Sequence, residues 1–187
     1  MDFKPLAIAD VVLLTPPVFG DERGFFMETF RQTEFEKHCG QYTFVQDNHS
    51  SSAHGILRGL HYQLEKPQGK LVRVTHGEVF DVAVDMRHSS PTFGQWVSAV
   101  LSAENKQMLW VPPGFAHGFY VISEQAEFQY KGTDYYNPGD EYCIRWDDPV
   151  LAIEWPLVNG EMPRVSAKDS QGVGFCNAPN FTTFKRK

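Results

Sequence analysis

The segment from Gly55 to Gln63, GILRGLHYQ, places an arginine and a histidine three residues apart inside an apolar run. Its leucines and isoleucine are typical of a buried strand, whereas Arg58 can bind anions and His61 can exchange protons near neutral pH. Burying a polar group without a partner costs roughly 2–7 kcal/mol. Two interpretations follow: a substrate site that uses both side chains, or a satisfied core histidine beside a surface arginine.

The spacing of these two residues raises a difficulty, because strict strand alternation directs Arg58 and His61 to opposite faces. Gly59 follows the arginine directly, and a glycine inside a strand often marks a bulge that redirects the next side chains. We therefore expect a bulge at Gly59 that brings both side chains to one mouth of the fold.

A second candidate histidine, His117, follows a turn in the segment PPGFAHGFYV. The pattern P-x-G-x-x-H resembles the second half of the cupin signature, whose histidine usually binds a metal inside a double-stranded β-helix barrel. The first half of that signature carries H-x-H, but here the matching residues are His61, Tyr62 and Gln63. Zinc and non-haem iron sites need at least three well-placed protein ligands. The sequence therefore predicts a barrel without a bound metal.

Two further polar segments have both a functional and a structural interpretation. In DERGFFMETF, a turn at 21–24 precedes a predicted strand with Phe26, Glu28 and Phe30 on one face, where the carboxylate is either functional or simply exposed at an edge. In QDNHSSS, residues 46–49 are all polar, which is typical of a turn whose side chains bond to its own backbone.

The elements that must position these residues are mostly short strands. Runs of β-branched and aromatic residues alternate with turn residues, and the clearest run, KLVRVTHGEVFDVAVDMR, predicts a hairpin that turns near His76 and Gly77. The series indicates an all-β sandwich or barrel. One helix is predicted, with a capping box formed by Thr33 and Glu36 and a C-terminal cap at Gly40.

Length and composition predict one domain of 187 residues, with an N-terminal strand region 1–45, a barrel core at about 46–156 and a folded-back tail 157–187. Three widely spaced cysteines indicate a reducing compartment, and no signal peptide or membrane span is evident. The net charge is −6 and basic residues are scattered. We therefore expect a soluble cytoplasmic protein that binds neither nucleic acid nor membrane.

Seven segments, which span almost the whole chain, resemble one family. The sequence is similar to the dTDP-4-dehydrorhamnose 3,5-epimerases in DERGFFMETF, QDNHSSSAHGILRGLHYQ, PQGKLVRVTHGEVFDVAVDMR, SPTFGQW, LSAENKQMLWVPPGFAHGFYV, YKGTDYY and SAKD. The resemblance implies a cupin-type jelly roll with a few short helices. It also implies a homodimer without metal or organic cofactor that acts on a dTDP-linked 4-keto-6-deoxy sugar, on the route to dTDP-L-rhamnose.

The resemblance also implies roles for individual residues. His61 would be the base and Tyr130 the proton donor. Asp169 would orient His61, and Lys70, or else His117, would stabilise the enolate. Arg58 and Arg23 would hold the pyrophosphate and nucleotide. The full set of implied substrate-binding residues is Arg23, Glu28, Gln46, Asp47, Asn48, Arg58, Lys70, His117, Glu141 and Lys168.

Two predictions concern the neighbours of these residues. We expect Asp81 to hydrogen-bond His117, with a buried structural aspartate as the alternative. We also expect strands from the 21–30 region to reach the partner's site in a dimer. The function classes left open are an epimerase acting at C3 only or C5 only, a metal-dependent cupin enzyme and a non-catalytic sugar-binding barrel.

Overall fold

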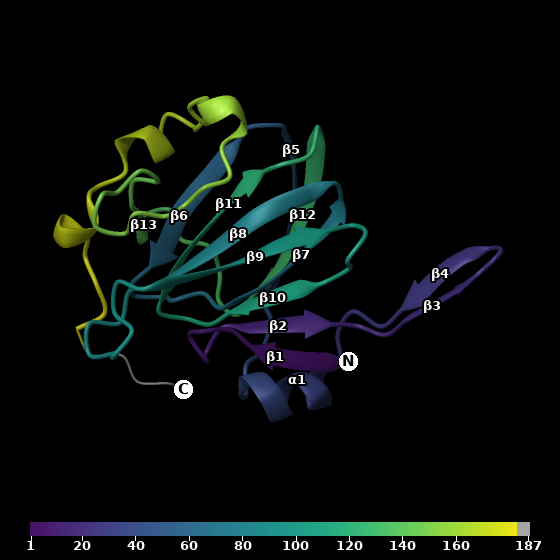
Figure 1. Ribbon diagram of the computed structural model, residues 1–187. Coiled ribbons are helices and arrows are strands. Elements are labelled where there is room, and N and C mark those ends of the chain that lie inside the picture. Colours follow the sequence, from purple (N-terminus) through teal and green to yellow (C-terminus); the bar gives the residue numbers. More distant parts are fainter. Residues whose placement is uncertain (183–187) are drawn as a thin grey trace.

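The computed structural model describes residues 1–182, which form two facing antiparallel sheets (Figure 1). The larger sheet has six strands in the spatial order β1 (Asp2–Pro5), β2 (Val12–Thr15), β10 (Met108–Val111), β7 (Lys70–His76), β12 (Gln125–Gly132) and β5 (Gln46–Ala53). The smaller sheet has five, in the order β13 (Glu141–Cys143), β6 (Leu57–Gln63), β11 (Phe115–Val121), β8 (Glu78–Asp85) and β9 (Trp96–Ser102). The predicted all-β jelly roll of cupin type is confirmed.

Apolar residues at alternate strand positions form the core between the two sheets. Val72 on β7 and Phe128 on β12 face Ala83 on β8 and Phe119 on β11, and all four are at least 95% buried. The opposite face of the five-stranded sheet is also apolar, because the chain after β13 packs over it. Trp155 and Phe181 of that segment join this second core. The segment contains three short 3-10 helices, η1 (Val158–Gly160), η2 (Asp169–Gln171) and η3 (Phe175–Asn177).

The predicted hairpin at residues 70–86 is wrong. β7 lies in the six-stranded sheet and β8 in the five-stranded sheet, so the turn at Gly77 carries the chain from one sheet to the other. Both strands carry apolar residues toward the same core, and the tight turn between them looks the same in either arrangement. Their real partners are distant in sequence: β7 pairs with β10 and β12, and β8 pairs with β9 and β11. The pairing of β7 and β8 with strands distant in sequence therefore places them in different sheets.

The single α-helix, α1 (Gln32–Cys39), covers the outer side of the six-stranded sheet. It buries Phe35 against the edge of the Trp110 ring, with centroids 4.9 Å apart. Gly40 ends the helix as expected, at a φ of 98°. The predicted capping box is wrong, because the helix begins earlier: Arg31 is the N-cap without a side-chain cap, and Glu36 instead accepts a hydrogen bond from Gln32.

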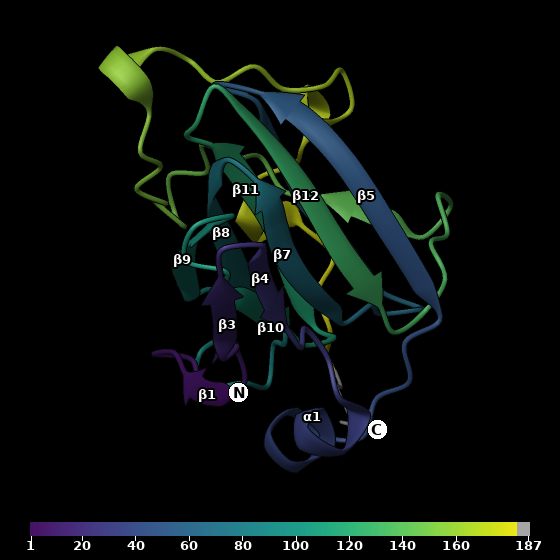
Figure 2. The same ribbon diagram turned by 90° about the vertical axis from the view of Figure 1, so that its right-hand side faces the viewer.

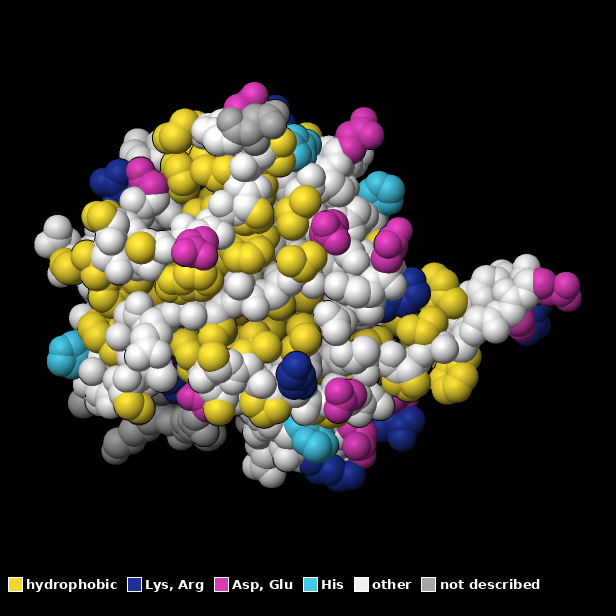
Figure 3. All heavy atoms as spheres, in the orientation of Figure 1, with side chains coloured by type: hydrophobic (Ala, Val, Ile, Leu, Met, Phe, Trp, Pro, Cys, Tyr) yellow, Lys and Arg dark blue, Asp and Glu magenta, His cyan; other side chains and the backbone are white. Residues whose placement is uncertain are grey.

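A two-stranded hairpin, β3 (Val18–Asp21) and β4 (Gly24–Met27), extends away from the body (Figures 1 and 3). The turn at 21–24 is confirmed, since Asp21 pairs with Gly24. The strand ends at Met27, so the expected shared face of Phe26, Glu28 and Phe30 does not form. The hairpin exposes three aromatic rings, Phe19, Phe25 and Phe26, each at 60% or more.

Residues 46–49 form the start of β5 rather than a turn. β5 pairs with β12 along its whole length, at the edge of the six-stranded sheet (Figure 2). Alternation along β5 points Asp47 and His49 to one face of the sheet and Asn48 to the other. Within residues 1–182, no helix combines the length and the apolar character needed to cross a membrane.

Candidate active site

A cavity of about 600 Å³ lies at one mouth of the barrel, which we call the main cavity. Strands of both sheets form its walls, and residues 164–169 of the C-terminal segment close one side. Its charged and titratable lining residues are His49, Arg58, His61, Lys70, His117, Tyr130, Arg164, Lys168 and Asp169. The structure therefore brings together eight of the sequence-predicted residues in this one place: Asn48, Arg58, His61, Lys70, His117, Tyr130, Lys168 and Asp169.

The bulge expected at Gly59 is confirmed. β6 takes three residues from Arg58 to His61 while β11 takes two from Phe119 to His117, so β6 holds one extra residue. The φ of Gly59 is +118°, and a Cβ there would lie 2.6 Å from the Cα of Gly118. Only glycine tolerates that conformation and that close approach. The extra residue turns both polar side chains toward the main cavity.

His61 and Asp169 form a hydrogen-bonded pair, with Nε2 2.5 Å from Oδ1. Burial alone would raise the pKa of the Asp169 carboxyl, but hydrogen bonds from His61, Ser166 and the Gly59 backbone together lower it. The carboxylate therefore stays ionised and accepts the proton on Nε2, which leaves the lone pair on Nδ1 to accept another. An aspartate in this position fixes the tautomer and stabilises the imidazolium that forms.

Lys70 and Tyr130 lie together on the opposite wall of the main cavity. The Lys70 ammonium is 5.7 Å from the centroid of the Tyr130 ring. Burial lowers the pKa of Lys70 to about 8, against a smaller raising effect of Asp81. Burial also raises the pKa of the Tyr130 hydroxyl, and this effect exceeds the lowering effect of the positive charge on Arg58. The tyrosine is therefore protonated at neutral pH, as a proton donor must be.

The predicted contact between Asp81 and His117 is confirmed. Nε2 of His117 lies 2.9 Å from both carboxylate oxygens, and the pair is buried in the core of the barrel. Burial raises the pKa of Asp81, and the neighbouring His117 and Lys70 oppose that rise. The His117 ring is thus fixed beside Lys70 at the inner end of the main cavity.

Glu141 and Lys168 form an ion pair near the rim. Glu141 also lies close to His61, with Oε1 3.8 Å from Nδ1, and it accepts a hydrogen bond of 2.7 Å from the hydroxyl of Tyr136. Tyr136 was not among the predicted site residues, although it lies within YKGTDYY, one of the segments that resemble the family. Its position in that segment was the one feature of the sequence that could have indicated a place in the site.

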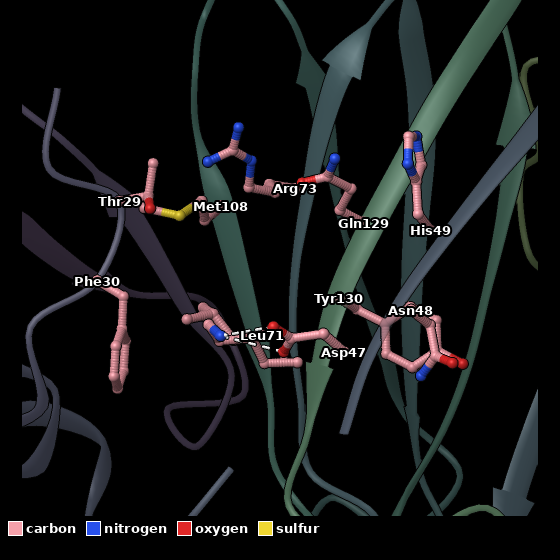
Figure 4. A pocket seen from close by; sticks show the side chains of 11 residues that line it. Thr29, Phe30, Asp47, Asn48, His49, Leu71, Arg73, Met108, Gln129 and Tyr130 are labelled. Carbon is pink, nitrogen blue, oxygen red and sulfur yellow. Dashed lines mark hydrogen bonds and ion pairs between the residues drawn. The ribbon is translucent and has the colours of Figure 1, made fainter. Parts of the chain in front are cut away.

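Alternation along β5 separates the polar residues at its start. Asn48 lines the main cavity and accepts a hydrogen bond of 3.0 Å from Gln46. Asp47 does not reach the main cavity. It pairs with Lys131 at 3.0 Å on the outer face of the sheet, where a second hollow of about 390 Å³ lies between the sheet and Phe30 (Figure 4).

Arg23 and Glu28 are also absent from the main cavity of their own chain. Arg23 lies in the turn of the projecting hairpin, where it hydrogen-bonds Asp21 at 3.1 Å. Glu28 follows the hairpin and pairs with Arg31 at 2.7 Å. Arg23 thus belongs to the hairpin that extends away from the body (Figure 1), whereas Glu28 lies in the segment that connects β4 to α1.

One set of side chains in the described residues has the composition of a metal site. Donor atoms of His61, Cys143 and Asp169 lie within 4.8 Å of one another. Burial, with Asp169 as a further cause, raises the pKa of the Cys143 thiol to about 12. Only a thiolate is a strong metal ligand, so this set is poorly suited to a metal ion at neutral pH.

The fold and the main cavity together define a jelly roll of cupin type in which a histidine–aspartate pair, a lysine and a tyrosine line one cavity. The family model for dTDP-4-dehydrorhamnose 3,5-epimerase matches residues 5–177. The chain belongs to this epimerase family, and the predicted resemblance is confirmed.

Relatives support this assignment in sequence and in structure. The chain is 61% identical to the dTDP-4-dehydrorhamnose 3,5-epimerase of Pseudomonas aeruginosa over 177 residues, which cover 94% of this chain and 97% of that protein. A Legionella pneumophila epimerase solved with dTDP-4-keto-L-rhamnose superposes with a TM-score of 0.92 at 49% identity, covering 97% of this chain and 99% of that chain. A 3'-monoepimerase from Streptomyces bikiniensis, solved with dTDP-quinovose, superposes with a TM-score of 0.86 at 30% identity, covering 92% of this chain and 87% of that chain.

Proposed function

We propose that this chain is a dTDP-4-dehydrorhamnose 3,5-epimerase. It converts dTDP-4-dehydro-6-deoxy-D-glucose to dTDP-4-dehydro-L-rhamnose by moving protons at C3 and C5. The observation that carries the proposal is the His61–Asp169 pair, at 2.5 Å, facing Lys70 and Tyr130 across the main cavity. His61 is the base and Asp169 its orienting carboxylate, while Lys70 supplies a cation and Tyr130 a protonated hydroxyl.

The reaction requires these groups for a simple chemical reason. A ketone at C4 acidifies the protons on both C3 and C5, because either carbanion delocalises onto the same oxygen as an enolate. His61 removes a proton from one face of the ring, and Tyr130 returns one to the other. Lys70 stabilises the enolate oxygen in its ammonium form, which predominates below pH 8 given its pKa of about 8.

The proposal predicts proton exchange at two carbons. The native protein is incubated with dTDP-4-keto-6-deoxy-D-glucose in deuterated water, and label is followed at C3 and C5 by NMR and mass spectrometry. We expect deuterium at both carbons, with inversion at both. Binding without label would instead indicate a sugar-binding barrel, and a requirement for a transition metal would indicate a metal-dependent cupin enzyme.

The same experiment separates the double epimerase from its nearest alternative. Label and inversion at one carbon alone would assign the chain as a 3-only or 5-only epimerase. That alternative is retained because a relative of this fold is a 3'-monoepimerase, although its identity to this chain is only 30%.

The chain is further proposed to act as a homodimer in which the hairpin of one protomer completes the main cavity of its partner. Exposed Phe19, Phe25 and Phe26 support this arrangement, as does the finding that Arg23 and Glu28 do not line the cavity of their own chain. A large exposed aromatic surface on a projecting hairpin is typical of an interaction site. A cytoplasmic location is proposed as well, supported by the three free cysteines.

Mixed dimers test the exchange of hairpins. Arg23→Ala and His61→Ala are each expected to be nearly inactive, but a dimer containing one of each has one site with both residues intact. Random pairing on co-expression makes half the dimers mixed, so activity should recover to about a quarter of the native value. Failure to recover activity, or a monomer by light scattering at micromolar concentration, would contradict the proposed dimer.

A further inference from the structure

Two arginines line the main cavity, and neither forms an ion pair with a described carboxylate. They are Arg58 and Arg164. Elsewhere, four of the described arginines pair with an aspartate or glutamate: Arg23, Arg31, Arg87 and Arg145. Unpaired guanidinium groups at the wall of a substrate cavity are positioned to receive an anion from solution.

The backbone places these two arginines at the same end of the main cavity. Arg164 forms an isolated parallel β-bridge with Ile56. The Arg164 carbonyl oxygen accepts a hydrogen bond of 3.0 Å from the Leu57 N–H, and the Arg164 N–H donates one of 2.8 Å to the Gly55 carbonyl oxygen. Arg58 follows two residues after Ile56, at the start of β6. In Figure 1 the yellow-green chain near residue 160 passes over this end of β6.

The Arg164 guanidinium keeps most of its donors free. Its one described hydrogen bond goes from Nη2 to the carbonyl oxygen of His54, and a guanidinium has five N–H donors. Arg58 donates from Nε to Ser52 Oγ at 2.9 Å and from Nη2 to the Ser51 carbonyl oxygen at 3.5 Å, and the residue is exposed. Both groups are held in place by a neutral partner, so their positive charge is not neutralised.

The charge balance of the main cavity favours an anionic ligand. Four lysine or arginine side chains line it against a single carboxylate, Asp169, and that carboxylate is engaged by His61. The four side chains are Arg58, Lys70, Arg164 and Lys168. Lys168 pairs with Glu141 near the rim, so the other three carry positive charge that no carboxylate neutralises by an ion pair among the described residues. A nucleoside diphosphate sugar carries two negative charges on its diphosphate. These two charges match the two positive charges of Arg58 and Arg164 at one end of the main cavity.

We propose that Arg164 binds the diphosphate group of the nucleotide-linked substrate, together with Arg58. This inference rests on the proposed function, because it takes a nucleoside diphosphate sugar as the ligand. Arg164 contributes binding and leaves the proton transfers to the groups around His61, which lies farther along β6. Its loss should therefore raise KM and leave kcat nearly unchanged.

The test compares Arg164→Gln with the native protein by calorimetric titration of dTDP and of thymidine. Glutamine keeps an N–H donor for the His54 carbonyl but removes the charge. We expect the Kd for dTDP to rise about 10-fold or more, since hydrogen bonds to charged groups are the stronger ones. The Kd for thymidine should not change. Arg164→Lys should retain part of the lost affinity.

Arg145→Gln is the matched control, because Arg145 is an exposed arginine outside the main cavity that pairs with Asp147. It should bind dTDP like the native protein. Native affinity in Arg164→Gln, or an equal loss for dTDP and thymidine, would overturn the inference and leave the proposed function standing. If the native protein itself did not bind dTDP, the proposed function would fail and the inference with it.

Discussion

His61→Ala is expected to lose solvent proton exchange and inversion together, at both C3 and C5. Without the imidazole no enolate forms, and the loss of a general base reduces the rate by roughly 10²–10⁴-fold. Asp169 remains, but a carboxylate with a lowered pKa is a weak base for a carbon acid. Deuterium incorporation and the rate of product formation, both measured by NMR, should fall by the same factor.

The control for this variant is His76→Ala, which removes an exposed histidine at the connection between β7 and β8. It should retain native rates, and both variants should bind dTDP. If His61→Ala still exchanged protons at the native rate, the base would be another group, and His117 is the next candidate in the main cavity. His117→Ala would then show the loss predicted here for His61.

Part of the structure around His61 and His117 was expected from the sequence. Strand alternation directs Arg58 and His61 to opposite faces, so placing both in one cavity, as the resemblance to the family implies, requires a bulge, and Gly59 indicated where it lies. The contact between Asp81 and His117 was also expected, although the pairing of β8 with β11 that brings the two together was not predicted. His61 and Asp169, 108 residues apart, were joined only by the resemblance to the family.

The failures share one physical cause, which is that local sequence does not contain long-range partners. The turn at Gly77 suits a hairpin, yet β7 and β8 belong to opposite sheets. The polar run at 46–49 looked like a turn because nothing local indicates that β12 pairs with it. Asp47 then followed the alternation of β5 and pointed away from the main cavity, toward Lys131.

The length of the projecting hairpin was mispredicted for a related reason. Residues 25–30 have the composition of a strand, but no neighbour pairs with the chain beyond Met27. Glu28 is consequently free of a sheet and pairs with Arg31 at the start of α1. Its role in substrate binding thus depends on the proposed partner protomer, which no property of a single chain can specify.

Tyr130→Phe should fail in a different way from His61→Ala. Phenylalanine keeps the ring packed 6.4 Å from Phe128 and beside Lys70, so the shape of the main cavity is preserved while the hydroxyl is lost. The base remains, so the enolate still forms. It is then quenched from the side that lost the proton, and deuterium enters with retained configuration.

Net epimerisation in Tyr130→Phe should therefore fall by roughly 10²-fold or more, the usual scale for losing a general acid, while exchange persists. The ratio of exchange to inversion, followed by NMR in deuterated water, is the decisive measurement. Tyr135→Phe is the control, because the Tyr135 ring is exposed on a loop outside the main cavity. It should invert both carbons at native rates. Inversion at the native rate in Tyr130→Phe would assign proton return to another donor. Lys70 is the next candidate, because its ammonium lies 5.7 Å from the centroid of the same ring and burial lowers its pKa to about 8.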